Sequence, residues 1–286
     1  HLDVVPTKDQ AWTTDPFKLT QIDGKLFGRG TTDMKGFIAL ALALSEQKDL
    51  PPITFAFSWG EEIGCLGIRT LLPELVKRAP WGCIVGEPTD LVPVIAHKGR
   101  STFQVHLKGL PVHSSRADIG RNAIHSIAKL VSEMDAANQD FSCAGPFDKA
   151  FMPPHSTVQV NMISGGSAPN IVAGVSEAMI EIRSIPGDDP NDVADRMRAC
   201  LSSLDIDATV SLKTCTPAFM TRSTTSPVKL ACNITGKPPK AVPFATEAGL
   251  FQSAGIETVV CGPGQIQQAH TANEFIMRDA LEAGAV

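Results

Sequence analysis

Strand-like and helix-favouring segments alternate near the start of the chain. Residues 53–59 (ITFAFSW) are rich in β-branched and aromatic side chains and predict a strand, whereas residues 34–44 (MKGFIALALAL) are apolar and predict a helix. A second apolar strand, Cys83–Val85, should end at Gly86-Glu87-Pro88, because proline stops strand pairing. This alternation is typical of an α/β fold.

A different pattern begins at about Pro93. It predicts a strand, a helix, two strands, a helix and a strand, at residues 101–107, 122–137, 156–163, 174–183, 190–204 and 208–212. The order β-α-β-β-α-β is that of a ferredoxin-like unit. After Cys215 the α/β pattern returns, with a helix at 247–254 and a strand at 258–261.

The simplest organisation is one domain inserted into another. A length of 286 residues fits two domains of roughly 100–200 residues each. We therefore expect one domain formed by residues 1–93 and 215–286 and an inserted domain at 94–214. The chain begins at His1, inside a motif, and its closing helix-like run at 278–286 lacks a C-cap signal, so we also expect residues to be missing, above all at the N-terminus.

Composition excludes several classes of protein. Hydrophobic residues make up 43% of the chain, and no apolar run approaches the roughly 18 residues that a membrane span needs. A net charge of −5 without a Lys/Arg cluster argues against a nucleic-acid partner. The seven cysteines are scattered and form no C-x-x-C pair, which favours reduced thiols in a cytoplasmic protein over a disulfide framework.

Potential metal ligands occur at predicted strand ends or in the loops that follow them, where open α/β sheets place their sites. The five candidates are His1, Asp33, Glu62, Glu87 and His270. Two histidines and three carboxylates suit a pair of zinc-like ions better than one structural zinc, which would prefer cysteines. Each candidate has an ordinary alternative: Asp33, for example, also stands where a helix N-cap is expected, and Glu62 could belong to a solvated loop.

Two carboxylates stand beside these candidates. The period of two along a strand places Asp3 on the same side as His1, where it could orient a metal-bound imidazole. Glu61 directly precedes Glu62, and two adjacent carboxylates repel one another unless a cation compensates. Glu61 is then free to act as the base for a metal-activated water.

The motifs HLDVVP, GRGTTDMKG, SWGEEIG, VGEPT, PVHSS and AHTANE follow one another along the chain. In this order they resemble the superfamily of di-zinc aminoacylases, carboxypeptidase G-type enzymes, succinyl-diaminopimelate desuccinylases and acetylornithine deacetylases. The resemblance implies a zinc-binding catalytic domain with an inserted lid and dimerisation domain. It also implies two zinc ions, or cobalt in their place, one held by His1, Glu87 and Asp33 and the other by Glu62, His270 and the same Asp33. Asp3 would orient His1, and Glu61 would be the general base.

Further motifs, AHKG at 96–99, NAI at 122–124, TEA at 246–248 and CGPGQIQQAH ending at His270, resemble the acetylornithine deacetylases within this superfamily. They imply hydrolysis of N-acetylornithine to acetate and ornithine, a step of arginine biosynthesis, by a cytoplasmic homodimer that associates through the inserted domain. Three alternatives stay open: another N-acyl amino acid, a dipeptide, or an inactive fragment with a structural or binding role.

Residues on the substrate side are also implied by the resemblance. His113 would reach the active site of a neighbouring subunit and stabilise the oxyanion, while Asn170 and Arg183 would hold the amide and the α-carboxylate of the substrate. A lone histidine such as His113 is otherwise usually a satisfied surface residue, and an arginine near a strand end such as Arg183 is usually a solvated charge. The ornithine ammonium requires an anion, for which Glu247 is the candidate, although an acid at a helix start is also explained by the helix dipole.

Overall fold

The computed structural model describes residues 1–204 and 206–285, which form two compact units. Unit 1 is His1–His97 with Phe219–Val286, and unit 2 is Lys98–Ala218. Both boundaries lie four residues later than the sequence pattern indicates. The strand β4 (Val94–His97) pairs with strands of unit 1, and β8 (Asp207–Thr216) continues to Thr216 in the sheet of unit 2. The chain is thus a mixed α/β protein in which one unit interrupts the other.

Unit 1 contains a five-stranded sheet with the order β10-β4-β11-β3, to which β9 is added beside β4. The strands other than β4 are β3 (Cys83–Val85), β9 (Phe219–Met220), β10 (Lys240–Val242) and β11 (Thr258–Val260). The pairs β10/β4 and β11/β3 are parallel. Val94, Phe219 and Val260 are fully buried here, so this sheet lies in the core of unit 1.

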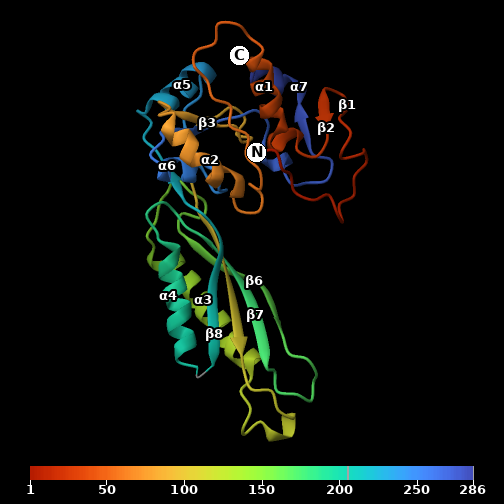
Figure 1. Ribbon diagram of the computed structural model, residues 1–286, viewed down its shortest axis with the longest axis vertical. Coiled ribbons are helices and arrows are strands. Elements are labelled where there is room, and N and C mark those ends of the chain that lie inside the picture. Colours follow the sequence, from red (N-terminus) through yellow and green to blue (C-terminus); the bar gives the residue numbers. More distant parts are fainter. Residues whose placement is uncertain (205, 286) are drawn as a thin grey trace. The chain divides into compact units, whose positions relative to one another are not determined.

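A second sheet of unit 1 is antiparallel and has the order β1-β2-β12. Its strands are β1 (Thr20–Ile22), β2 (Lys25–Phe27) and β12 (Phe275–Met277). The helices of unit 1 are α1 (Gly36–Ser45), α2 (Leu66–Lys77), α5 (Ser226–Thr235), α6 (Ala248–Ser253) and α7 (Arg278–Ala283), with short helical turns η1 (Thr31–Lys35) and η3 (Ile266–Gln268). Figure 1 shows these elements around the N-terminus of the chain.

The predicted strand at 53–59 does not form, so this prediction was wrong. The segment is extended but lies outside every sheet, and Leu2 donates one backbone hydrogen bond to the Ser58 carbonyl (3.0 Å). Ile53 and Trp59 are 44% and 54% exposed. An apolar, β-branched composition favours a strand, but a strand also requires a neighbour for its N–H and C=O groups, which composition does not specify. His1 and Asp3 likewise lie in an irregular segment.

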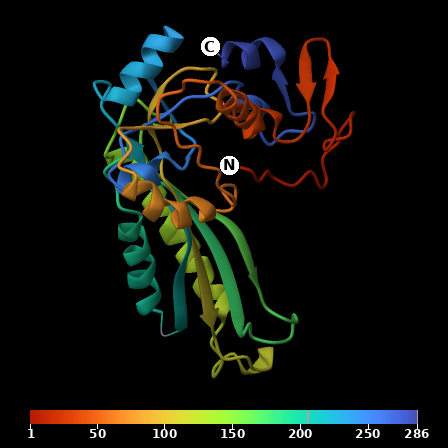
Figure 2. The same ribbon diagram turned by 45° about the horizontal axis from the view of Figure 1, so that its top comes forward.

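Unit 2 has the predicted order β-α-β-β-α-β. Its elements are β5 (Arg100–Lys108), α3 (Ala123–Ala144), β6 (Thr157–Gly165), β7 (Val175–Arg183), α4 (Pro190–Ser202) and β8 (Asp207–Thr216), with the short turn η2 (Ser114–Arg116). The strands form one antiparallel sheet, β6-β7-β5-β8. Both helices lie on the same face of this sheet (Figures 1 and 2).

Local sequence explains the two helices of unit 2. The Asn122 side chain caps α3 by accepting hydrogen bonds from the backbone of Ile124 and His125, and Asp189 caps α4 in the same way, with Pro190 at the first helical position. Their apolar faces pack on the alternating apolar residues of β5 and β7. Of the helices in the described residues, including the long α3, none is apolar enough over a sufficient length to cross a membrane.

Candidate metal centre

Loops of unit 1 position the candidate ligands. Glu87 follows β3 after Gly86, and a Cβ atom added at Gly86 would lie 2.1 Å from the ring of Phe37, so glycine is required for this close approach. Glu61 and Glu62 stand in the turn that leads into α2, and Asp33 lies in η1 before α1.

The first group of ligands consists of His1, Asp33 and Glu87, all buried. The imidazole Nε2 of His1 lies 3.2 Å from Asp33 Oδ1 and 3.8 Å from Glu87 Oε1. The three residues offer atoms that all lie within 4.8 Å of one another. Such a cluster of one nitrogen and two carboxylate groups has the spacing and chemistry of a divalent-metal site.

The second group consists of Asp33, Glu62 and His270. The Nε2 atom of His270 lies 3.1 Å from Asp33 Oδ2 and 3.1 Å from Glu62 Oε2. Asp33 therefore turns one oxygen toward His1 and the other toward His270. Asp33 thus belongs to both groups, and a third group of possible ligands, His1, Glu61 and Glu62, overlaps them.

Asp3 connects the first group to the turn at Glu61-Glu62. Its backbone carbonyl lies 2.9 Å from His1 Nδ1 and its carboxylate Oδ1 lies 3.5 Å from the same nitrogen. The two carboxylate oxygens accept hydrogen bonds from the backbone N–H groups of Glu61 and Glu62, each at 3.2 Å. The hydrogen-bond partner of His1 Nδ1 is thus the Asp3 backbone carbonyl, while the Asp3 carboxylate holds the backbone of the two glutamates, a contact that the sequence did not indicate.

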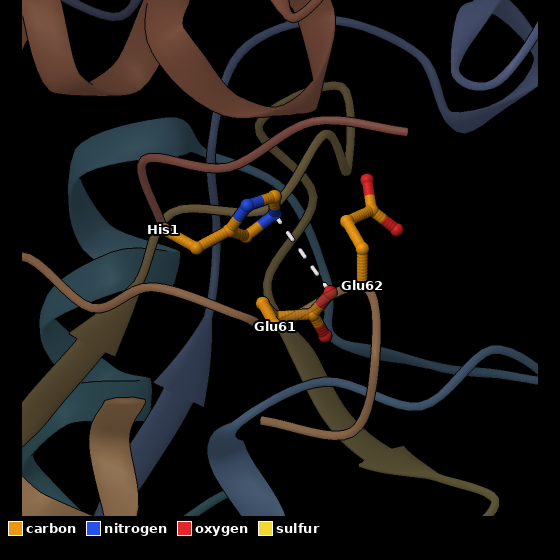
Figure 3. Close-up of side chains that lie close together, drawn as sticks. All are labelled: His1, Glu61 and Glu62. Carbon is orange, nitrogen blue, oxygen red and sulfur yellow. Dashed lines mark ion pairs between the residues drawn. The ribbon is translucent and has the colours of Figure 1, made fainter. Parts of the chain in front are cut away.

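Figure 3 shows Glu61 extending toward His1. Its Oε2 atom lies 3.9 Å from His1 Nε2. Burial raises the pKa of Glu61, the positive charge of His1 opposes this, and the neighbouring charges of Glu62 and Asp33 raise it further, to about 7. A carboxylate with such a pKa can exchange a proton near neutral pH, as a general base must.

Burial and neighbouring charges also shift the pKa values of Glu87 and Asp33. Burial raises the pKa of Glu87 well above its ordinary value, and the charges of Asp33 and Glu61 add to the effect. Burial also opposes ionisation of Asp33, but its hydrogen bonds with His1 and His270 prevail and lower its pKa. The positive charges that act on the pKa values of these carboxylates are those of His1 and His270.

The pKa values of His1 and His270 are both raised. Burial by itself lowers the pKa of His1, but the hydrogen bond to Asp33 and the charges of Glu87 and Glu61 raise it to about 11. Hydrogen bonds to Asp33 and Glu62 raise the pKa of His270 to about 10, against the effect of burial. Because the donors are nitrogen and oxygen atoms with an excess of buried negative charge, the residues fit divalent cations.

Glu247 precedes α6, and only 6% of its surface is exposed. Burial raises its pKa, and its charge acts on the pKa values of Glu61 and Glu87. A side-chain hydrogen bond with Ser58 and the charge of His1 oppose the effect of burial on the pKa of Glu247. Glu247 is therefore a buried acid near the candidate ligands, and it also stands at the N-cap of α6, where the helix dipole favours a negative charge.

The three remaining site candidates lie in unit 2. His113 is exposed, its Nδ1 lies 2.8 Å from Ser115 Oγ, and the neighbouring Ser114 N–H donates to the Asn170 carbonyl (2.9 Å), so His113 and Asn170 are local neighbours. Arg183 stands at the end of β7 and donates to Glu181 (2.9 Å). The roles of these residues toward a substrate stay predictions.

One residue of the site was missed by sequence reasoning. Glu274 is buried in the segment that follows His270, and its carboxylate accepts hydrogen bonds from the loop that carries Asp33. The only signal in the sequence was its place in the motif AHTANE, which indicated His270 and gave Glu274 no role.

Comparisons with known proteins identify the family of this chain. Residues 1–286 match the profile of peptidase family M20/M25/M40. An acetylornithine deacetylase of Myxococcus xanthus is 34% identical over 299 residues, covering 100% of this chain and 76% of the relative. An acetylornithine deacetylase of Pasteurella multocida (strain Pm70) is 33% identical over 295 residues, covering 99% of this chain and 75% of the relative.

Solved structures share the fold. An M20 family metallo-carboxypeptidase from Sulfolobus solfataricus superposes with a TM-score of 0.77 at 19% identity, covering 99% of this chain and 80% of that one. Human carnosine dipeptidase 1 superposes with a TM-score of 0.70 at 21% identity, covering 100% and 77%. At these identities the likeness concerns the fold alone.

Proposed function

Because the chain belongs to peptidase family M20/M25/M40, and is thus a hydrolase of a family that uses divalent metal, we propose that it hydrolyses N-acetylornithine to acetate and ornithine. The observation that carries this proposal is the position of Asp33 between two groups of ligands, with Glu61 beside them. The relatives from Myxococcus xanthus and Pasteurella multocida, both acetylornithine deacetylases, support this choice of substrate.

We propose zinc, with cobalt as a substitute, as the metal. His1 and Glu87 would hold one ion, Glu62 and His270 the other, and Asp33 both. When bound, the pair of ions would polarise the acyl carbonyl and lower the pKa of a water molecule. The His1 and His270 nitrogens must lose their protons to bind metal, so metal binding should release protons.

Glu61 is the proposed general base. It takes a proton from the water whose oxygen adds to the acyl carbon, and then delivers a proton to the nitrogen of the leaving amine as the C–N bond breaks. Water is thereby divided between the two products, acetate and ornithine. Asp3 supports Glu61 by accepting the hydrogen bond of its backbone N–H (3.2 Å).

Recognition of the substrate requires one anion and several polar groups. We assign Glu247 to the ornithine ammonium, because it is a buried carboxylate near the candidate ligands and a negative charge suits a cationic side chain. Arg183 is assigned to the α-carboxylate, for which its planar guanidinium is suited, and Asn170 to the amide.

His113 is assigned to the oxyanion in the active site of a second subunit, which makes the proposed enzyme a homodimer that associates through unit 2. Exposed apolar residues on the edge strand β6 support this, since Met162 and Ile163 are 67% and 57% exposed. We also propose that the enzyme works in the cytoplasm, where its free cysteines would stay reduced and where arginine biosynthesis needs it.

A panel of substrates tests the proposed function. The zinc-loaded protein should hydrolyse N-acetylornithine with a higher kcat/KM than N-succinyl-diaminopimelate, simple N-acetyl amino acids or dipeptides. A preference for a dipeptide would make the chain a dipeptidase of the same family. Absence of hydrolysis across the panel by a protein that binds zinc would instead identify a structural or binding role.

A further inference from the structure

The Glu274 side chain is 1% exposed and its carboxylate accepts four hydrogen bonds. Oε1 accepts from the backbone N–H groups of Thr32 (3.0 Å) and Asp33 (3.1 Å). Oε2 accepts from the backbone N–H of Gly30 (3.0 Å) and from Arg29 Nη1 (2.7 Å). Both carboxylate oxygens are thus fully engaged with one loop.

That loop, residues 28–33, ends at Asp33, whose two oxygens face the two groups of ligands. Glu274 binds the backbone N–H of Asp33 itself and those of two preceding residues. A displacement of this backbone would move the Asp33 carboxylate by a similar amount. Hydrogen bonds to an ionised carboxylate are stronger than those between neutral groups, so the loop is held firmly.

Arg29, which donates to Glu274, is also connected to His270 through Gln10. Arg29 also donates to Gln10 Oε1, and Gln10 Nε2 donates to the backbone carbonyl of His270 (2.9 Å). The Arg29 guanidinium stacks on Trp12, 5.1 Å from the ring centroid, and the Trp12 indole N–H donates to Gln10 (3.1 Å). Loop 28–33 is therefore connected to both ends of loop 270–274, at His270 and at Glu274.

Loop 270–274 needs such support, because His270 and Asn273 adopt positive φ angles of 62° and 57°. The Asn273 side chain accepts hydrogen bonds from the backbone N–H (2.7 Å) and the hydroxyl (2.9 Å) of Thr13. One short loop thus supplies a candidate ligand, His270, and also the carboxylate that fixes the loop of the bridging Asp33.

We propose that Glu274 is a positioning residue of the metal centre, which fixes Asp33 between the two groups of ligands and relates it to His270. This inference rests on the proposed function, since it concerns the metal ions that the proposed reaction requires. It concerns the alignment of ligands, and Glu274 itself makes no contact with metal or substrate.

The test is Glu274→Gln in the full chain. Glutamine has one acceptor oxygen, and its amide N–H₂ would face N–H donors, so two of the four hydrogen bonds are lost. We expect zinc affinity, measured by competition with a chromogenic chelator, to fall roughly 10–100-fold, and kcat to fall while KM changes little. Wild-type zinc affinity in a folded Glu274→Gln protein would overturn the proposal.

Two control variants separate positioning from charge and from stability. Glu282→Gln removes an exposed carboxylate that pairs with Arg278, and it should leave zinc affinity unchanged. Val259→Ala destabilises a buried core cluster of unit 1 that contains none of the candidate ligands. If Val259→Ala weakens zinc binding as much as Glu274→Gln at an equal loss of stability, the effect is one of stability and the proposal fails.

Glu274→Asp keeps the charge but shortens the side chain, and it carries the test if Glu274→Gln does not fold. A folded Glu274→Asp protein should bind zinc more weakly than the wild type, and equal affinity would overturn the proposal. Failure of both variants to fold would assign Glu274 to the fold instead of to positioning. If the wild type binds no zinc, the proposed function fails, and the role of Glu274 fails with it.

Discussion

Asp3 and Glu61 illustrate how single residues are constrained in this site. The Asp3 carboxylate approaches His1 and also accepts the backbone N–H groups of Glu61 and Glu62. Glu61 is consequently fixed at its backbone, while its carboxylate lies beside His1. Backbone fixation allows the side chain to be exchanged for one of equal size without moving the turn.

Glu61→Gln should therefore retain metal and lose activity. The amide fills the same space but cannot accept a proton, so kcat should fall by roughly 10²–10⁴-fold, the usual contribution of a general base. Metal content by atomic emission and steady-state kinetics measure the two effects. Glu74→Gln, at an exposed position of α2, is the matched control. Turnover near the wild-type value in Glu61→Gln would exclude Glu61 as the base.

Glu247→Gln tests the selection of the substrate. If Glu247 pairs with the ornithine ammonium, the variant should lose about 1–3 kcal/mol in kcat/KM for N-acetylornithine, the scale of a hydrogen bond between charged groups. N-acetylleucine has no ammonium on its side chain, so its hydrolysis should be almost unchanged. Equal losses on both substrates would reject Glu247 as the selecting residue.

At the scale of secondary-structure elements, the strand β7 carries Glu181, whose contribution to stability should depend on pH. Burial alone would raise the pKa of Glu181, but hydrogen bonds from Arg100 (2.8 Å) and Arg183 (2.9 Å) lower it. A carboxyl whose pKa is lower in the folded state stabilises the fold above its unfolded pKa, and this stabilisation is lost as pH falls through the folded value.

Glu181→Gln should therefore lower the free energy of unfolding at pH 7, and the difference from the wild type should shrink as the pH falls below the ordinary range of glutamate. Urea unfolding at a series of pH values measures this. Glu177→Gln on the same strand is the control, because its side chain is more exposed and lies 3.8 Å from His106. A difference independent of pH would contradict the expected role of the Arg100 and Arg183 hydrogen bonds.

The elements of unit 2 agree with their predicted order because local patterns determine them. Asn122 and Asp189 mark the helix starts, and the alternation in β5 and β7 marks one buried face. The segment 53–59 has equally apolar residues but no partner strand among the described residues. Composition therefore predicts which segments can form strands, and pairing decides which of them do.

At the scale of the whole molecule, all five candidate ligands lie in unit 1. We therefore expect zinc binding to protect the ligand loops of unit 1 more than unit 2. Zinc at 100 times its dissociation constant should stabilise the folded state by about 2.7 kcal/mol, because it binds only the assembled site. Hydrogen exchange should consequently slow in the ligand loops of unit 1. The paired strands β5 and β7 of unit 2 serve as the internal reference.

Hydrogen exchange followed by mass spectrometry, with zinc and after chelation, measures this effect. Equal protection of both units would contradict a metal centre confined to unit 1. Absence of protection in the loops around Asp33 and His270 would exclude these loops as the metal site.

The sequence by itself determined the residue types of the site and the order of the elements. Histidines and carboxylates at loop positions are local features, and so are helix caps and alternating apolar residues. The family motifs also imply how the candidate ligands would be divided between two ions. These properties depend on a few neighbouring residues, which is why they can be read along the chain.

Only the tertiary structure shows that Glu274 accepts the backbone N–H of Asp33 and that Asp3 accepts the backbone N–H of Glu61. It also decides that the strand β4 belongs to unit 1. Glu274 accepts the N–H of a residue that stands 241 positions earlier. Hydrogen bonds of this kind require donors and an acceptor from distant segments to meet at about 3 Å, and no local pattern specifies such a meeting. The local sequence thus determines which residue types are available to the site, and tertiary packing determines how those residues are aligned.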